Sequence, residues 1–219
     1  MNLLLILSLL LCPYVYGDSL DEPTLTRDYF ESASKDSDIV ESGGQIIYYE
    51  TAGYEQGSYT YTMHLYGNGI MLLYYHERID TSDEHSFYFI DNKTGYEHIG
   101  NYLMNEGINE SQSSTMWYWD KPPYRTNYLM TLRLGEFYST IEYTQEENQD
   151  KPEWYSMVAY VKEYMEGYMV EENAISGKEY LVNKYEMEEI YGKYIYVPDY
   201  SIRQYVKEVE REDVEALKH

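Results

Sequence analysis

Tyrosine is the residue type that gives this chain its main chemical capacity. The sequence holds 30 tyrosines beside 4 phenylalanines and 3 tryptophans. A protein that needs only aromatic bulk can use phenylalanine, which has no hydroxyl group to pair when it is buried. The excess therefore indicates a use for the phenol itself, although tyrosine also suits strands and half-buried sheet positions. A tyrosinase converts phenols to catechols and o-quinones, to which amines, imidazoles and other rings add.

The tyrosines are spread from Tyr29 to Tyr205, and the densest group has lysines beside it. One face of a sheet cannot hold them all, so we expect many phenols to be exposed, in the folded precursor or after it unfolds during assembly. We expect the dense group to react first, because segments near a chain end open more easily than a sheet core. The cross-linking candidates are Tyr185, Tyr191, Tyr194, Tyr196, Tyr200, Tyr205, Lys184, Lys193 and Lys207.

No other constellation matches a catalytic or metal-binding motif. The one dense group of metal-ligand types comprises His76, Glu77, Asp80, Asp83, Glu84 and His85. Its spacing matches neither the helical zinc motif nor the calcium loop, so we interpret it as a charged strand end. The sequence also lacks a G-x-S-x-G nucleophile motif and a phosphate-binding glycine loop. We therefore predict a non-enzymatic protein without a metal or cofactor.

Residues 1–17 are predicted to be a signal peptide. The apolar run from Leu3 to Leu11 is too short to span a bilayer and has the length of a signal-peptide core. The only cysteine, Cys12, lies in this segment, so covalent toughening of the mature chain would need a chemistry other than disulfides. Asn92 and Asn109 begin glycosylation sequons. We predict an extracellular protein released through secretory granules.

The charge of the chain restricts its partners. The formal net charge is −23, which argues against nucleic acids and anionic membranes and favours cations or basic proteins as electrostatic partners.

Together, these features resemble a known family, the trematode eggshell precursors of the vitelline protein B type, with their eggshell synthesis domain. The similarity lies in the short secretory leader, the cysteine-free mature chain and the dispersed tyrosines with charged residues between them. It implies conversion of tyrosine to DOPA, a phenol oxidase that acts on the chain, and cross-linking to itself and to other coat proteins.

The strand-like and helix-like patterns along the chain predict an α+β fold. In this fold an antiparallel sheet, either a meander or an open barrel, is followed by C-terminal helices that together position these side chains. Residues 18–44 are expected to be a loosely ordered acidic leader, and 45–219 a single tyrosine-rich domain. Within it, 45–145 should be mainly strands and 150–219 mainly helices. The predicted segments are strands at 86–91, 115–119, 127–134 and 137–144, and helices at 154–169, 178–191 and 201–217.

The clearest local signal is a hairpin over residues 58–79. Asn68-Gly69 is the two-residue sequence typical of a type I′ turn. With that turn, the pairs on one side would be Tyr61 with His76, Met63 with Tyr74, and Leu65 with Leu72.

The functional prediction is a secreted structural precursor that is cross-linked through oxidised tyrosines into an extracellular coat such as an eggshell. Two alternatives stay open. One is a small-ligand carrier with a lipocalin-like barrel, and the other is an acidic secretory protein that binds calcium or basic partners through diffuse charge.

Overall fold

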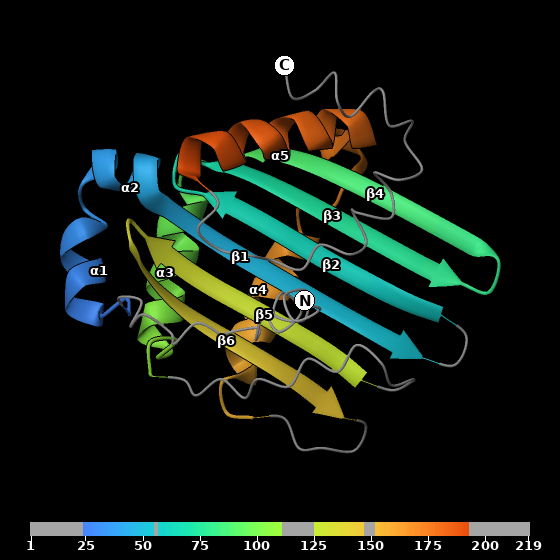
Figure 1. Ribbon diagram of the computed structural model, residues 1–219, viewed down its shortest axis with the longest axis horizontal. Coiled ribbons are helices and arrows are strands. Elements are labelled where there is room, and N and C mark those ends of the chain that lie inside the picture. Colours follow the sequence, from blue (N-terminus) through green and yellow to red (C-terminus); the bar gives the residue numbers. More distant parts are fainter. Residues whose placement is uncertain (1–23, 55–56, 111–124, 147–151, 193–219) are drawn as a thin grey trace, which may run out of the picture.

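One open antiparallel sheet forms the centre of the fold (Figure 1). The computed structural model describes residues 24–54, 57–110, 125–146 and 152–192. Its seven strands lie in the order β6-β5-β1-β2-β3-β4-β7. Their bounds are β1 Gly44–Tyr54, β2 Gly57–Tyr66, β3 Ile70–Ile79, β4 Ser82–Asp91, β5 Arg125–Leu134, β6 Phe137–Glu146 and β7 Ala174–Ile175. The predicted α+β class is confirmed, and the strands form an open sheet rather than a closed barrel.

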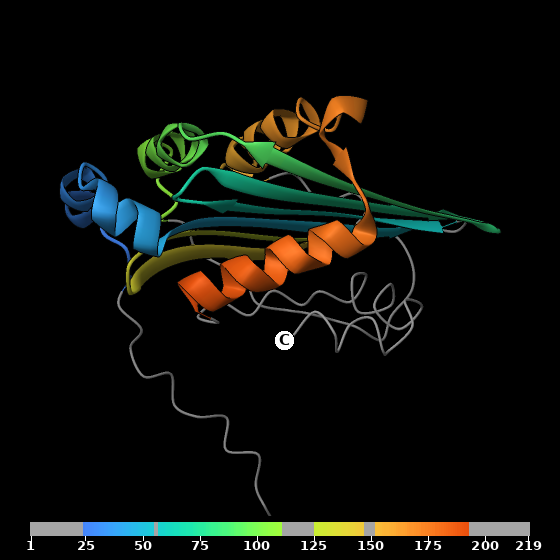
Figure 2. The same cartoon turned by 90° about the horizontal axis from the view of Figure 1, so that it is seen from above.

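Helices cover both faces of this sheet (Figure 2). Helices α3 (Gly95–Asn105) and α4 (Tyr155–Glu166) lie on one face, and α5 (Gly177–Tyr191) crosses the other. A 3-10 turn, η1 (Glu171–Asn173), follows α4. No helix in the described ranges is both long enough and apolar enough to cross a membrane.

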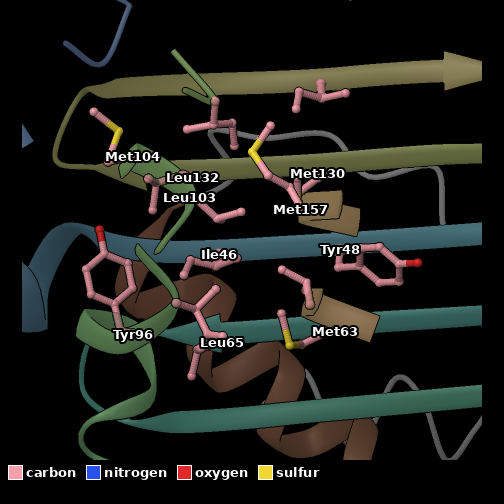
Figure 3. Close-up of a cluster of buried hydrophobic side chains, with 14 of the residues drawn as sticks. Ile46, Tyr48, Met63, Leu65, Tyr96, Leu103, Met104, Met130, Leu132 and Met157 are labelled. Carbon is pink, nitrogen blue, oxygen red and sulfur yellow. The ribbon is translucent and has the colours of Figure 1, made fainter. Parts of the chain in front are cut away.

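The larger core lies between the sheet and helices α3 and α4 (Figure 3). Cross-strand pairing builds it in rows, because Ile46 of β1 lies between Leu65 of β2 and Leu132 of β5. The next row places Tyr48 between Met63 and Met130. Methionine from α4 and α3 fills the space above these rows, as Met157 and Met104 show in Figure 3.

The predicted C-terminal helices α4 and α5 are both present close to their expected positions. The start of α5 follows from Ser176, whose side chain accepts a hydrogen bond from the backbone N–H of Glu179. The expected strand at 115–119, the helix at 201–217 and the signal peptide at 1–17 lie outside the described residues.

The expected loosely ordered leader is wrong over residues 24–44. Two helices, α1 (Arg27–Ala33) and α2 (Ser37–Gly43), begin at the N-caps Thr26 and Asp36. Phe30 is fully buried, and its ring lies where a side chain at Gly100 of α3 would have to sit. Most residues of these short helices are polar or charged, and only a few reach the core. The sequence pattern therefore resembled that of a disordered segment.

Helix α3 lies inside the region that the sequence assigned mainly to strands. Tyr96, Ile99 and Leu103 are buried on one side of it. Their spacing of three and four residues is helical and was the available signal.

The hairpin of β2 and β3 exists, but its predicted register is wrong by one residue. Tyr61 pairs with Tyr75, Met63 with Leu73, and Leu65 with Met71. The connection is a three-residue loop in which Gly69 alone has a positive φ, 92°, and the backbone N–H of Gly69 donates to the carbonyl of Tyr66. A type I turn followed by a left-handed glycine adds one residue to the loop and so shifts every pair.

Candidate functional site

With Tyr54 left aside, because only its backbone is described, the tyrosine side chains in the described part of the chain are all buried or half-buried. The expectation of many exposed phenols therefore fails for the folded state of these residues. The rings pack against one another, and several hydroxyl groups find partners inside the protein. Access to an oxidant in the folded state then depends on half-buried rings.

The described members of the sequence-predicted cross-linking group lie on α5. Tyr185 is half-buried, but Tyr191 and Lys184 are only 3% and 8% exposed. The hydroxyl of Tyr191 accepts a hydrogen bond from the backbone N–H of Asn68 at 3.1 Å. Reaction at Tyr191 or Lys184 therefore requires α5 to move away from the sheet. Tyr194, Tyr196, Tyr200, Tyr205, Lys193 and Lys207 lie outside the described residues.

The closest pair of described phenol rings lies where α3 and α4 run side by side. Tyr102 and Tyr160 stack with ring centroids 3.8 Å apart and planes 27° apart. Both rings are half-buried. The Nε2 atom of His98, an exposed residue one turn before Tyr102, lies 2.7 Å from the Tyr160 hydroxyl oxygen. We refer to Tyr102, Tyr160 and His98 as the stacked pair and its histidine.

The electrostatics around Tyr102 favour a neutral phenol. Burial raises the pKa of Tyr102, and the negative charge of Glu106 raises it further. A phenol with a raised pKa keeps its proton at neutral pH. The Nε2 atom of His98 is within hydrogen-bonding distance of the other hydroxyl of the pair, that of Tyr160.

A second pair of phenols follows along α4. The rings of Tyr164 and Tyr168 have centroids 5.2 Å apart. The side-chain amide of Asn92 donates to both hydroxyl oxygens, at 3.0 Å in the case of Tyr168. A glycan would be attached to this amide nitrogen and would replace one of its two hydrogens, so glycosylation of Asn92 would break at least one of the two hydrogen bonds. Asn109, the other sequon residue, is half-buried.

A buried carboxylate organises a third group of phenols. Glu50 is 2% exposed and accepts hydrogen bonds from the hydroxyls of Tyr48 and Tyr59. Its Oε1 atom also lies 3.0 Å from the Nζ atom of Lys162. That ammonium group in turn lies 4.6 Å from the ring centroid of Tyr61, within cation–π range. The ion pair with Glu50 therefore holds Lys162 beside these rings.

Sequence reasoning missed all three groups. It paired lysines with adjacent tyrosines, whereas the structure pairs His98 with Tyr160, 62 residues away, and Glu50 with Lys162, 112 residues away. No local pattern marks such pairs. The only sequence signal was the four-residue spacing of Tyr160 and Tyr164 on α4 and of Tyr168, which follows its end.

The described hollows do not form the barrel interior that a lipocalin-like carrier needs. One hollow of about 450 Å³ lies beside Arg133 and Tyr191, and another of about 350 Å³ lies beside His85 and Ile175. Neither is enclosed by the sheet, which ends in the edge strands β6 and β7. The barrel on which the carrier alternative rests is therefore not formed by the described strands.

No protein-family model, curated protein or solved structure matches this chain.

Proposed function

We propose that this protein is a secreted structural precursor that a phenol oxidase cross-links, through its tyrosines, into an extracellular coat such as an eggshell. The observation that supports the proposal most directly is the stacked pair and its histidine. Tyr102 and Tyr160 offer two half-buried rings within 3.8 Å, and His98 lies within hydrogen-bonding distance of one hydroxyl. This arrangement combines oxidisable rings, a proton acceptor and partial access in one place.

The chemistry balances with dioxygen as the oxidant. A tyrosinase inserts an oxygen atom next to the phenol hydroxyl and gives a catechol. A further two-electron oxidation gives the o-quinone, and the electrons and protons leave on oxygen as water. An imidazole, an amine or another ring then adds to the quinone, which restores a catechol and forms the covalent link between chains.

The half-buried state of these rings is compatible with a protein that must be stored before it is cross-linked. Fully buried phenols cannot associate between copies of the precursor, and this favours its solubility. The half-buried phenols at the edge of the core stay within reach of an enzyme. The net charge of −23 adds repulsion between copies at neutral pH.

The proposal is tested by treating the purified mature protein with tyrosinase and mapping modified peptides by mass spectrometry over time. We expect catechols at Tyr102 and Tyr160 before any at Tyr66, which is fully buried, followed by covalent oligomers stable to detergent and reductant. The double variant Tyr102→Phe/Tyr160→Phe should slow oligomer formation several-fold, and the matched control Tyr66→Phe should leave it unchanged. A parent protein that stays monomeric after prolonged oxidation would overturn the proposal.

A further inference from the structure

Near the turn that joins β3 and β4, the structure brings together three of the six potential metal ligands that lie close together in the sequence. His76 lies directly opposite His85 in the strand register, and Asp83 lies two residues before His85 on the same side of β4. Glu77 and Glu84 form the intervening pair, so their side chains point to the other face of the sheet. The group has no recognisable spacing because its members come from two strands.

The three side chains converge closely. The Nε2 atom of His76 lies 2.6 Å from Oδ1 of Asp83, and the Nε2 atom of His85 lies 3.6 Å from the same oxygen. All three ligand atoms are within 4.8 Å of one another. The two imidazole rings stack with centroids 4.4 Å apart.

The surroundings of His85 are those of a supported ligand. Its Nδ1 atom lies 3.0 Å from the hydroxyl of Tyr74, and the Tyr74 side chain is fully buried. A hydrogen bond at Nδ1 orients the ring and leaves Nε2 as the coordinating atom, which is how metal-binding histidines are commonly held. Asp83, the third ligand, is exposed, which gives an ion and its water access from solvent.

We propose that His76, His85 and Asp83 bind one divalent transition-metal ion of the zinc or copper class. Two imidazole nitrogens and one carboxylate oxygen form a donor set that Zn²⁺ accepts, with water as the remaining ligand. Calcium and magnesium prefer sites made of oxygen alone and are disfavoured here. This inference rests on the hairpin geometry and does not depend on the proposed cross-linking.

Binding requires a small rearrangement. The two rings lie within 7° of parallel, so their lone pairs must tilt towards each other about the Cβ–Cγ bonds. That torsion is soft in histidine. The ion would also replace the hydrogen bond between His76 and Asp83. Asp83, whose side chain is 47% exposed, can move outward to make room.

One nearby charge opposes the ion. Arg78 lies opposite Asp83 in the register and on the same face as the three ligands. Its positive charge lowers the affinity of the site for a cation but leaves the ligands in place. Replacing Arg78 by Gln should therefore tighten binding, an effect that a purely structural hairpin would not show.

The experiment is calorimetric titration of the full mature protein with Zn²⁺, in a buffer with excess Mg²⁺ that saturates diffuse acidic sites. We expect one ion per chain. His85→Gln and Asp83→Asn should each weaken binding at least about ten-fold, and Tyr74→Phe should weaken it about ten-fold through loss of ring orientation. Visible absorption with Co²⁺ should show bands of a site with nitrogen ligands, and these should be lost in His85→Gln.

The control is His98→Gln, which removes an exposed histidine outside the group and should leave the affinity unchanged. Asp83→Asn alters an exposed side chain and should preserve the circular dichroism spectrum, so a folding defect cannot account for its result. The inference is overturned if Zn²⁺ binds no more tightly than Mg²⁺, or if His98→Gln weakens binding as much as His85→Gln does.

Discussion

The two faces of the sheet use tyrosine in different ways. On the face covered by α3 and α4, the core consists mainly of aliphatic and methionine side chains, and half-buried tyrosines form its rim. On the face covered by α5, Tyr66, Tyr74 and Tyr180 are themselves the core, together with Phe87. Half-buried tyrosines therefore lie mainly around the core of the α3 and α4 face, where Tyr48, Tyr96 and Tyr128 are also buried, whereas tyrosine on the α5 face is chiefly buried packing. The proposed oxidation is therefore expected, in the folded protein, at the half-buried tyrosines of the α3 and α4 face.

The largest effect that we expect is unfolding of the protein at alkaline pH, caused by ionisation of its buried tyrosines. Burial raises the pKa of Tyr61 from 10.0 to about 12, and it also raises the pKa of Tyr66 and Tyr96. These phenols hold their protons more tightly in the folded chain than in the unfolded chain. Their contribution to stability is complete below pH 10 and is lost as the pH rises through the folded-state pKa values. We expect the protein to unfold above about pH 10.

Parallel pH titrations by tyrosinate absorbance and by circular dichroism check this expectation. The fully buried phenols of Tyr66 and Tyr96, whose pKa values are raised by burial, should ionise only together with unfolding. Full ionisation of all tyrosines at unchanged circular dichroism would contradict the picture of a sealed face.

Truncation of a buried leucine on each face of the sheet should lower the free energy of unfolding by different amounts. Leu65 and Leu72 are fully buried and point to opposite faces of the sheet, towards α3 and α4 or towards α5. Leu65→Ala should lower the free energy of unfolding by about 4 kcal/mol, and Leu72→Ala by about 2 to 3 kcal/mol. The cavity behind Leu72 can relax more, because α5 is the one helix that covers that face in the described ranges. Urea denaturation measures both values, and a larger loss for Leu72→Ala would reverse the ranking of the faces.

Replacement of the buried Glu50 should lower the free energy of unfolding by less than truncation of a core leucine, but by more than replacement of a surface carboxylate. Glu50→Gln removes the charge that accepts from Tyr48 and Tyr59 and pairs with Lys162. We expect a loss of about 2 kcal/mol in the free energy of unfolding. The matched control is Glu84→Gln on the exposed end of β4, which should change stability by less than about 0.5 kcal/mol. Equal losses from the two variants in urea denaturation would show that the Glu50 network is not stabilising.

The smallest expected effect loosens α5 alone. Ser176→Ala removes the N-cap of that helix and should destabilise it by about 1 kcal/mol. Tyr191 should then be modified faster by tyrosinase, while the rate at Tyr160 stays the same. Thr26→Ala removes the N-cap of α1 and serves as the control, with no change at Tyr191. Time-resolved peptide mapping tests this, and equal acceleration at both tyrosines would mean that the faces do not open independently.

Local pattern accounts for much of the fold. Strand-like segments between turn residues predicted β2 to β6, and helical spacing after Pro152 predicted α4. Features that depend on distant contacts were missed. The register of β2 and β3 depends on the loop, where the backbone N–H of Gly67 also donates to the carbonyl of Gly44 on β1. Helix α1 depends on the fit of Phe30 against Gly100.

The sequence by itself determined that this protein is rich in oxidisable phenols, strongly acidic and built from an antiparallel sheet with helices, because composition and periodicity are local properties. Only the tertiary structure decided which phenols are sealed and which lie at a rim. It also decided that Tyr160 meets Tyr102 and His98, and that His76 meets His85 and Asp83. These contacts join residues that are distant in the sequence, so they depend on helix packing and strand register. Packing and register are in turn determined by burial across the whole chain.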